Sequence, residues 1–200
     1  TIQTNAPATE WWRVASSANG AKLVAVEAIR LEDSTAESNS PTTGIYISTD
    51  SGVTWALQTN APNVMYWTSI ASSPDGNHLA ATAISGTGAT VFGTVCLSAD
   101  AGTNWVATDL PTNFAWASIA VSTDGSKLIV SGDNCPIYVS ANSGATWTQA
   151  IEPGTNTFAV TASADGTKLA AATLNDGLFV STNSGINWSQ ITNAPETPEG

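Results

Sequence analysis

The chain has 200 residues, of which 42% are hydrophobic and 10% are charged, so it can bury a core and lacks the composition of a disordered chain. Sixteen acidic residues against five basic ones give a net charge of −11, which leaves no basic face for nucleic acid or an anionic membrane surface. The apolar runs are too short to form a membrane helix, which needs roughly 18 residues, so membrane insertion is not expected.

Four octapeptides recur along the chain with the pattern S-x-[DN]-x-G-x-[TN]-W. They span 48–55, 98–105, 140–147 and 181–188, so their terminal Trp residues are 50, 42 and 41 positions apart. A second motif runs in step with them: ANGAKL (18–23), PDGNHL (74–79), TDGSKL (123–128) and ADGTKL (164–169). A period of about 40–45 residues is typical of the blades of a β-propeller.

Each repeat predicts four short strands, A to D, in the same order along the chain. Strand A lies around Val14, Ile70, Ile119 and Val160, and an Asn-Gly or Asp-Gly pair after it favours a tight hairpin turn. Strand B follows at 22–28, 78–84, 127–132 and 168–174, and strand C at 44–48, 94–98, 136–140 and 177–181. Strand D begins at the Trp of the octapeptide. Because helix signals are absent and Ser, Thr and Val are frequent, we expect an all-β fold.

The octapeptide contains the residues of a tight turn between strands C and D. Asp or Asn at its third position accepts backbone hydrogen bonds, Gly adopts a positive φ, and Trp buries a large ring between sheets. We expect structural roles for four equivalent sets: Ser48, Asp50, Gly52 and Trp55; Ser98, Asp100, Gly102 and Trp105; Ser140, Asn142, Gly144 and Trp147; Ser181, Asn183, Gly185 and Trp188. The hairpin acids Asp75, Asp124 and Asp165 are likewise expected to form turns.

The octapeptide resembles the Asp-box, or BNR, repeat of sialidase-like, sortilin-like and xyloglucan-hydrolase-like β-propellers, and the resemblance covers essentially the whole chain. It implies a β-propeller, or a propeller arc, of four four-stranded antiparallel blades with Asp-box turns between strands C and D. We expect a single domain over 1–200, with blades at about 11–60, 66–110, 115–151 and 157–195. Residues 1–7 (TIQTNAP) match 56–62 (ALQTNAP) and predict an extra outer strand D at the N-terminus.

Four blades of this size would be crowded around a common axis. Three arrangements therefore stay open: a fragment of a propeller with more blades, several chains that complete a larger ring as a homo-oligomer, and a closed monomer. An open arc would expose sheet faces and edges, which favour association.

Candidate ligand-binding residues lie on the face formed by the D–A and B–C connections, which such propellers usually use. Trp11, Trp67 and Trp116 share one aligned position at the start of strand A, where they either stack on sugar rings or fill space between blades. Arg13 either clamps an anion or pairs with Glu10 or Glu27. Acids of the B–C loops are further candidates, or else are simply solvated: Glu32, Asp33, Asp133 and Asp176.

No convergent catalytic set is visible in the sequence. The sialidases that the chain resembles bind a substrate carboxylate with three arginines, whereas this chain has only Arg13 and Arg30. The single His78 lies on a predicted turn, and the two cysteines, Cys96 and Cys135, have no metal-ligand spacing. We therefore expect no catalytic residue, no metal and no cofactor.

The sequence best fits a non-catalytic extracellular or cell-surface propeller that acts as a binding or structural scaffold for a protein or glycan partner. The alternative is a fragment of a propeller glycoside hydrolase, which needs two carboxylates about 5–9.5 Å apart. Acids on loops of the predicted ligand face keep that alternative open: Asp33, Asp109, Asp133 and Asp176.

Overall fold

The computed structural model describes residues 6, 7, 9–27, 43–62, 64, 66–87, 90–150, 156–174 and 176–192, and these form sixteen strands and no helix. The strands make four separate four-stranded antiparallel sheets, which we call blades 1 to 4 in chain order. The prediction of an all-β fold with four such blades is confirmed. The described part of the chain has no helix that could span a membrane.

Within each blade the strands follow one another in sequence order. Blade 1 contains β1 (Trp11–Ser16), β2 (Leu23–Glu27), β3 (Ile45–Ser48) and β4 (Ala56–Leu57), and blade 2 contains β5 (Tyr66–Ser72), β6 (Leu79–Thr87), β7 (Thr90–Ser98) and β8 (Val106–Ala107). Blade 3 contains β9 (Ala115–Val121), β10 (Leu128–Asp133), β11 (Cys135–Ser140) and β12 (Thr148–Gln149), and blade 4 contains β13 (Thr157–Ala162), β14 (Leu169–Thr173), β15 (Leu178–Ser181) and β16 (Ser189–Ile191).

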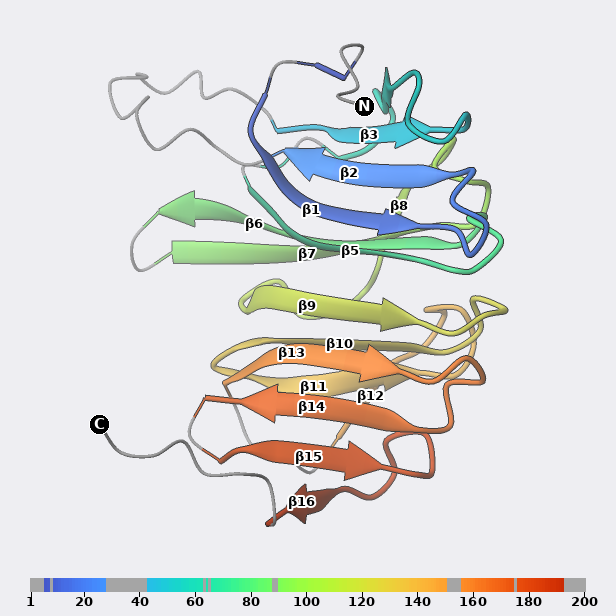
Figure 1. Cartoon of the computed structure of the whole chain (residues 1–200). Helices are drawn as coiled ribbons and strands as arrows, with labels where there is room; N and C mark the ends of the chain where they lie inside the picture. Colours follow the sequence, from blue (N-terminus) through green and yellow to red (C-terminus); the bar gives the residue numbers. More distant parts are fainter. Residues whose placement is uncertain are drawn as a thin grey trace, which may run out of the picture.

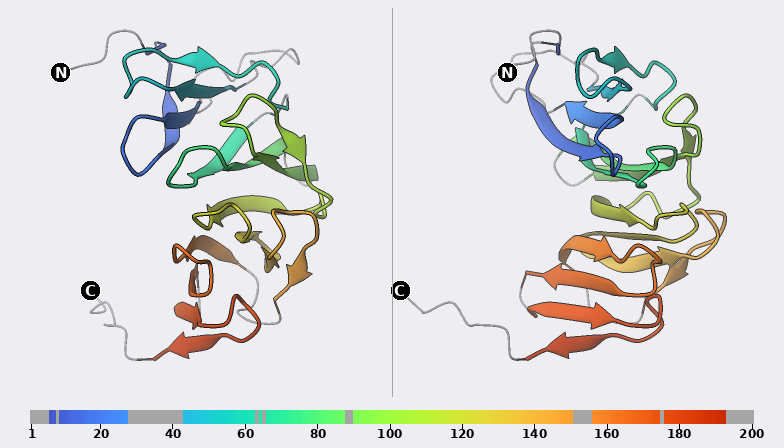
Figure 2. Two further views of the ribbon diagram at one scale, coloured as in Figure 1. Left: turned by 90° about the vertical axis from the view of Figure 1, so that its right-hand side faces the viewer. Right: turned by 45° about the vertical axis from the view of Figure 1, so that its right-hand side comes forward.

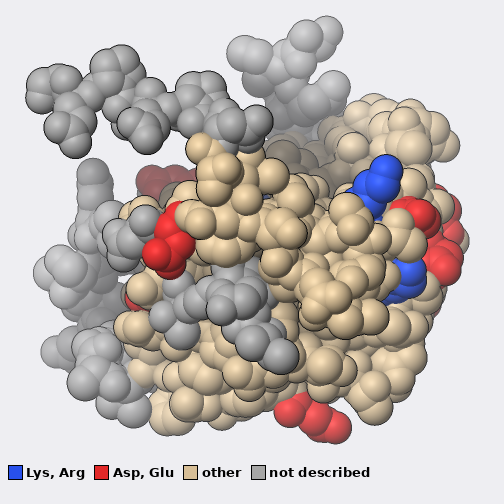
Figure 3. Space-filling model, turned by 90° about the horizontal axis from the view of Figure 1, so that it is seen from below, with Lys and Arg blue, Asp and Glu red and all other residues tan. Residues whose placement is uncertain are grey.

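The four blades stack face to face along an open arc, with blades 1 and 4 at its two ends (Figures 1 and 2). Most of the described residues that are visible from the blade 4 end are uncharged (Figure 3). The predicted extra strand at 1–7 falls mostly outside the described residues, and Ala6 and Pro7 belong to no strand.

The octapeptide turns share one pattern of hydrogen bonds. In blade 2, Gly102 N donates to Ser98 Oγ (2.8 Å), and Asn104 N donates to the Asp100 carboxylate (2.9 Å). In blade 3, the amide of Asn142 takes the place of the carboxylate and accepts from Thr146 N at the same distance of 2.9 Å. The residue before each turn Gly has a φ between 56° and 60°, and the Gly itself one between 82° and 87°. An acceptor oxygen followed by two positive-φ residues therefore defines the turn, whether the acceptor is Asp or Asn.

The A–B hairpins are held by a second Ser and acid pair. Ser122 Oγ donates to Asp124 Oδ1 (2.7 Å), and Lys127 N donates to Ser122 Oγ (2.9 Å). The other hairpins repeat this arrangement, with Asn19 in place of the acid in blade 1. These hydrogen bonds favour the ionised carboxylate and hold the pKa of Asp75 and of Asp124 at about 2.

The hairpin acids give a testable dependence of stability on pH. Because their folded-state pKa lies below the unfolded value of 3.8, their stabilisation is complete above about pH 4 and is lost as the pH falls toward 2. When the pH is lowered from 4 to 2, we expect the melting temperature of the triple variant Asp75→Asn/Asp124→Asn/Asp165→Asn to fall less than that of the wild type. Thermal melts monitored by circular dichroism at each pH test this. If the melting temperatures of the two proteins fall in parallel with pH, the prediction is wrong. Asn is a suitable replacement because Asn19 occupies the equivalent position in blade 1 and accepts a hydrogen bond from Ala21 N.

The core consists of three layers between neighbouring blades. Val24, Val26 and Ile45 of blade 1 pack against Trp67, Ile70 and Leu79 of blade 2 in one cluster, and two further clusters join blade 2 to blade 3 and blade 3 to blade 4. A β-bulge interrupts the pairing of strand A with strand B in every blade. Burial between blades, rather than within one sheet, therefore stabilises the arc.

Candidate functional site

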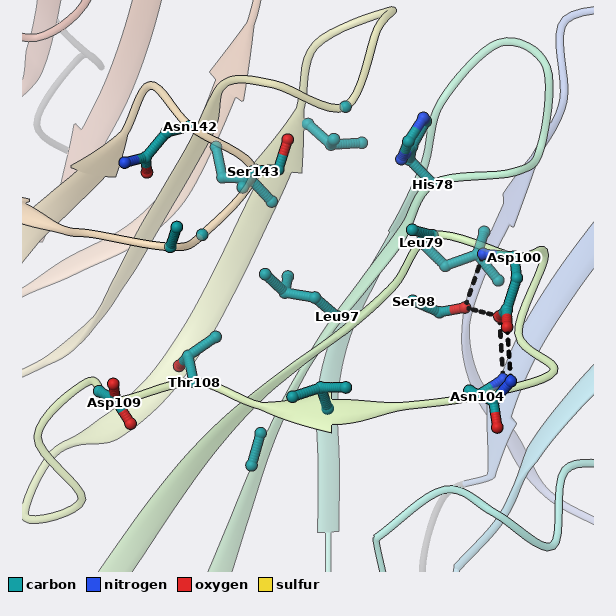
Figure 4. A pocket seen from close by; sticks show the side chains of 18 residues that line it. His78, Leu79, Leu97, Ser98, Asp100, Asn104, Thr108, Asp109, Asn142 and Ser143 are labelled. Atoms are coloured by element: carbon teal, nitrogen blue, oxygen red, sulfur yellow. Dashed lines mark hydrogen bonds between the residues drawn. The ribbon is translucent and has the colours of Figure 1, made fainter.

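A cleft with a volume of about 720 Å³ lies between blades 2 and 3, at their outer edges (Figure 4). Its floor is aliphatic and is made by Leu79, Leu97, Val121 and Leu128. One wall is the octapeptide turn of blade 2 together with β8 and the residues after it, and the other is the octapeptide turn of blade 3. The cleft therefore combines an apolar base with a polar rim.

The same position is more closed at the other two junctions. The corresponding cleft has a volume of about 210 Å³ between blades 3 and 4 and about 10 Å³ between blades 1 and 2. At the junction of blades 1 and 2, Asn60 Nδ2 donates to Thr103 O (3.2 Å) and ties the outer strand to the next turn. Leu110 occupies the aligned position in blade 2 and is buried in the core. Leu110 cannot form this polar bridge and instead packs in the apolar cluster that joins blade 2 to blade 3.

The polar groups of the cleft differ in their availability. Asp100 accepts hydrogen bonds from Asn104 N, Asn104 Nδ2 and Ser98 Oγ, which lower its pKa. Thr108 Oγ1 is buried and has no partner among the described residues. Asp109 is exposed at the rim, and the ring of His78 lies over Gly125. A ligand in the cleft therefore meets an imidazole and one carboxylate that the turn does not use, whereas the Thr108 hydroxyl lies beneath the surface.

The cleft also has an open strand edge. In blade 2 the strand order is β5-β6-β7-β8, so β8 lies at the outer edge of its sheet. Val106 in β8 is 68% exposed and faces the cleft. Edge strands present unpaired backbone groups that another extended segment can use.

Two of the three predicted ligand-binding tryptophans are buried, which corrects the prediction that they offer a stacking face. Trp67 and Trp116 are 2% and 1% exposed. Trp67 Nε1 donates to Thr43 O (3.1 Å), and the Trp116 ring packs edge-on against Phe114 and Tyr138. They fill the space between blades, which was the second of the two expected roles.

Trp11 and Arg13 are exposed on blade 1, but Arg13 contacts neither of the acids considered for it. Its Cζ lies 4.5 Å from the centroid of the Trp12 ring, and its Nη1 donates to Trp12 O (3.1 Å). Glu27 instead accepts a hydrogen bond from Gly44 N (2.7 Å). The expected ion pair of Arg13 is thus replaced by a cation–π contact.

The loop acids are not gathered into one site by the described structure. Asp133 ends β10, while Asp176 lies in the loop before β15, where Gln190 Nε2 donates to its backbone oxygen (2.6 Å). Glu32 and Asp33 lie outside the described residues. Within the described ranges no group of three or more His, Cys, Asp or Glu side chains is arranged to hold a metal ion.

Both cysteines are buried and free. Burial raises the pKa of the Cys96 thiol and of the Cys135 thiol to about 12. At neutral pH both are therefore protonated and behave as small apolar core residues.

Sequence reasoning pointed to the loop face and missed the cleft between blades 2 and 3. The available signal was the change from Asn60 to Leu110 at one aligned position after strand D. Its meaning depends on a contact with the following blade, which the repeat pattern alone does not show.

No protein-family model matches the chain, and no curated protein matches it either. Among solved structures, it is similar to the GH74 xyloglucanase from Xanthomonas campestris, with a TM-score of 0.67 and 17% identity over 91% of this chain and 30% of that one. It is also similar to an ancestral GH74 enzyme, with a TM-score of 0.63 and 22% identity over 93% of this chain and 26% of that one. A third similarity is to Kuenenia stuttgartiensis hydrazine synthase, with a TM-score of 0.57 and 14% identity over 86% of this chain and 58% of that one.

These similarities concern the fold. With its four four-stranded blades, the chain is an arc of a β-propeller. It spans about a third or less of the length of the two GH74 enzymes. Propellers serve many unrelated functions, so the function has to be argued from the site.

Proposed function

We propose that the chain is part of a non-catalytic propeller that binds a protein partner, with the cleft between blades 2 and 3 as its binding site. The observation that carries this proposal is the cleft itself, which pairs an aliphatic floor with the open edge of β8. An extended segment of a partner protein would pair with the strand edge and place alternate side chains on the floor. By holding a partner at this cleft, the chain would also act as a scaffold.

The composition of the cleft favours a peptide segment over a glycan. None of the described residues that line it is Trp, Tyr or Phe, so it has no large flat ring for a sugar to stack on. Among the described lining residues, the rim has amide, hydroxyl and backbone groups and the carboxylates of Asp100 and Asp109, with His78 as the only basic side chain. A neutral, partly apolar segment fits such a surface better than an anionic one.

Catalysis has less support than binding. The acids of the turns, including Asp100 in the cleft, accept hydrogen bonds that lower their pKa, so they are unsuited to donate a proton near neutral pH. Of the carboxylates at the cleft, only Asp109 is outside such a turn, and glycoside hydrolysis requires two.

The Asp-box assignment and the extracellular or cell-surface location belong to the same proposal. The bonds of Ser, Asp and Gly in the four octapeptides support the first. The acidic composition, with Ser and Thr frequent along the chain, supports the second.

Filling the cleft tests the binding proposal. A displayed peptide library selected on the wild-type chain would supply the ligand, and calorimetry would give its Kd. We expect Val106→Trp to weaken binding at least tenfold, because the new ring occupies the space beside β8. Ser189→Trp, at the aligned position of blade 4, is the matched control and should bind as the wild type does. Equal binding by both variants would contradict the site.

A glycan remains the second candidate partner, and a propeller glycoside hydrolase fragment the second candidate function. The xyloglucanase among the similar structures motivates both. A glycan array separates the partners, since selective glycan binding without any selected peptide would replace the proposal. Polysaccharide hydrolysis by the wild type that decreases in Asp133→Asn or Asp176→Asn would support the glycoside hydrolase function. The absence of hydrolysis by the wild type would reject it.

A further inference from the structure

One residue of β8 has its backbone hydrogen-bonding groups directed out of the sheet of blade 2. β7 and β8 pair with Cys96 opposite Ala107, and in the adjacent pair Thr108 N donates to Val95 O (2.9 Å). In an antiparallel ladder, opposite residues alternate between pairs that exchange hydrogen bonds and pairs that do not. Because Thr108 and Val95 form a bonded pair, Ala107 and Cys96 do not. The N–H and C=O of Ala107 therefore point away from β7, toward the open edge.

The two faces of β8 lead to different parts of the molecule. Residues opposite each other in a ladder place their side chains on the same face. Leu97, which lies opposite Val106, forms part of the cleft floor and packs against the cluster between blades 2 and 3. Cys96, which lies opposite Ala107, belongs to the cluster between blades 1 and 2. The face of Val106 is therefore the one that continues onto the floor of the cleft.

Ala107 has the smallest side chain among the residues at its aligned position. The equivalents are Leu57 in blade 1, Gln149 in blade 3 and Gln190 in blade 4. The Gln190 side chain is already engaged, since its Nε2 donates to Asp176 O (2.6 Å). A residue that pairs with a strand edge brings its Cβ to about 4.5–5.5 Å from the Cβ opposite, so a methyl group there leaves the most room. Blade 2 thus offers the least obstructed edge at this position.

We propose that Ala107 is the backbone anchor of the peptide site proposed above, on which this assignment rests, and that it sets a single register for the bound segment. The central residue of the segment, x2, pairs antiparallel with Ala107: its N–H donates to Ala107 O, and its C=O accepts from Ala107 N. Residues x1 and x3 then share the face of Val106 and lie on the floor, whereas x2 shares the face of Ala107. The partner is therefore a protein with an extended segment in which two apolar residues flank one residue of any type.

The size and the polarity of the cleft fit this pattern. Side chains two positions apart in a strand are separated by about 6.6 Å along it. The cleft volume of about 720 Å³ leaves room for two of them above the aliphatic floor. In Figure 4, His78 and Asp109 lie on opposite sides of Leu97, so polar side chains lie beyond the floor in both directions. Apolar residues at x1 and x3, with polar residues outside them, match that order.

N-methylation of the ligand tests the register on the unmodified protein. The probe is the tightest peptide obtained from the displayed library, resynthesised with a methyl group on one backbone nitrogen at a time, and calorimetry gives each Kd. Methylation at x2, the residue between its two apolar residues, removes the N–H that bonds Ala107 O and should weaken binding about tenfold or more. Methylation at x1 or x3, whose N–H groups face away from β8, should leave the Kd nearly unchanged. Binding that tolerates the methyl group at x2 would overturn the proposal, whichever other position is sensitive.

A proline substitution tests the same hydrogen bond from the side of the protein. Ala107→Pro removes the outward N–H and keeps the ladder with β7, so we expect peptide binding to weaken about tenfold at a nearly unchanged melting temperature. Gln149→Pro is the matched control and should bind as the wild type does, because Ala150 N donates to Ile137 O (2.8 Å) and the Gln149 N–H likewise faces outward. If Val106→Trp weakens binding and Ala107→Pro does not, the cleft binds peptides but Ala107 is not the anchor. If the library yields no peptide, the proposed function itself is wrong, and the anchor with it.

Discussion

Trp105→Ala is expected to lower the free energy of unfolding by about 3–5 kcal/mol, the usual range for truncation of a buried large aromatic side chain. Trp105 is 9% exposed and belongs to the cluster between blades 1 and 2, together with Ile47, Leu79 and Cys96. Its removal leaves a cavity between two rigid sheets, which cannot close without moving one blade against the other. Urea unfolding followed by circular dichroism would measure the loss.

Trp105→Phe is the control that separates ring burial from hydrogen bonding. The Trp105 Nε1 atom is buried and has no partner among the described residues, so Phe at this position loses volume without losing a hydrogen bond. We expect this variant to lose only about 1–2 kcal/mol. If Phe and Ala cost the same, the stabilisation does not come from filling the space between the blades.

The turns could be predicted from sequence because their interactions are local. Ser98, Asp100 and Gly102 lie within five residues, and each contact that defines the turn is formed inside the octapeptide. A spacing that repeats four times therefore contains nearly all the information needed for the hairpins and strands. The alignment of the repeats also predicted that Cys96 is buried, because Cys96 aligns with strand residues of the other blades.

The candidate site could not be predicted in the same way, because it depends on neighbours from another repeat. Trp11 and Trp67 occupy one aligned position, yet the first is 38% exposed and the second 2%, because among the described residues only Trp67 packs against a neighbouring blade on that side. The cleft likewise depends on how the outer edges of blades 2 and 3 meet rather than on a motif. A repeat pattern specifies each blade, while burial and clefts follow from how successive blades meet.

Gly102→Val is expected to lower the free energy of unfolding by about 2–5 kcal/mol, through two separate effects. The φ of Gly102 is +87°, a region that costs an L residue about 1–2 kcal/mol. A Cβ there would also meet Ile47 of blade 1, which is 7% exposed and has little room to move, and such overpacking costs about 1–3 kcal/mol.

Gly177→Val separates the two effects. Gly177 has a similar φ of +80°, but no described atom lies within 4 Å of a Cβ placed on it, so its variant should show the backbone cost alone. Urea unfolding of both variants gives the difference, which measures how tightly blade 1 presses on the octapeptide turn of blade 2. Equal losses would mean that Ile47 yields freely and that the junction is looser than its geometry indicates. A larger loss for Gly102→Val would mean that the turn glycines are required by the neighbouring blade as well as by their own backbone.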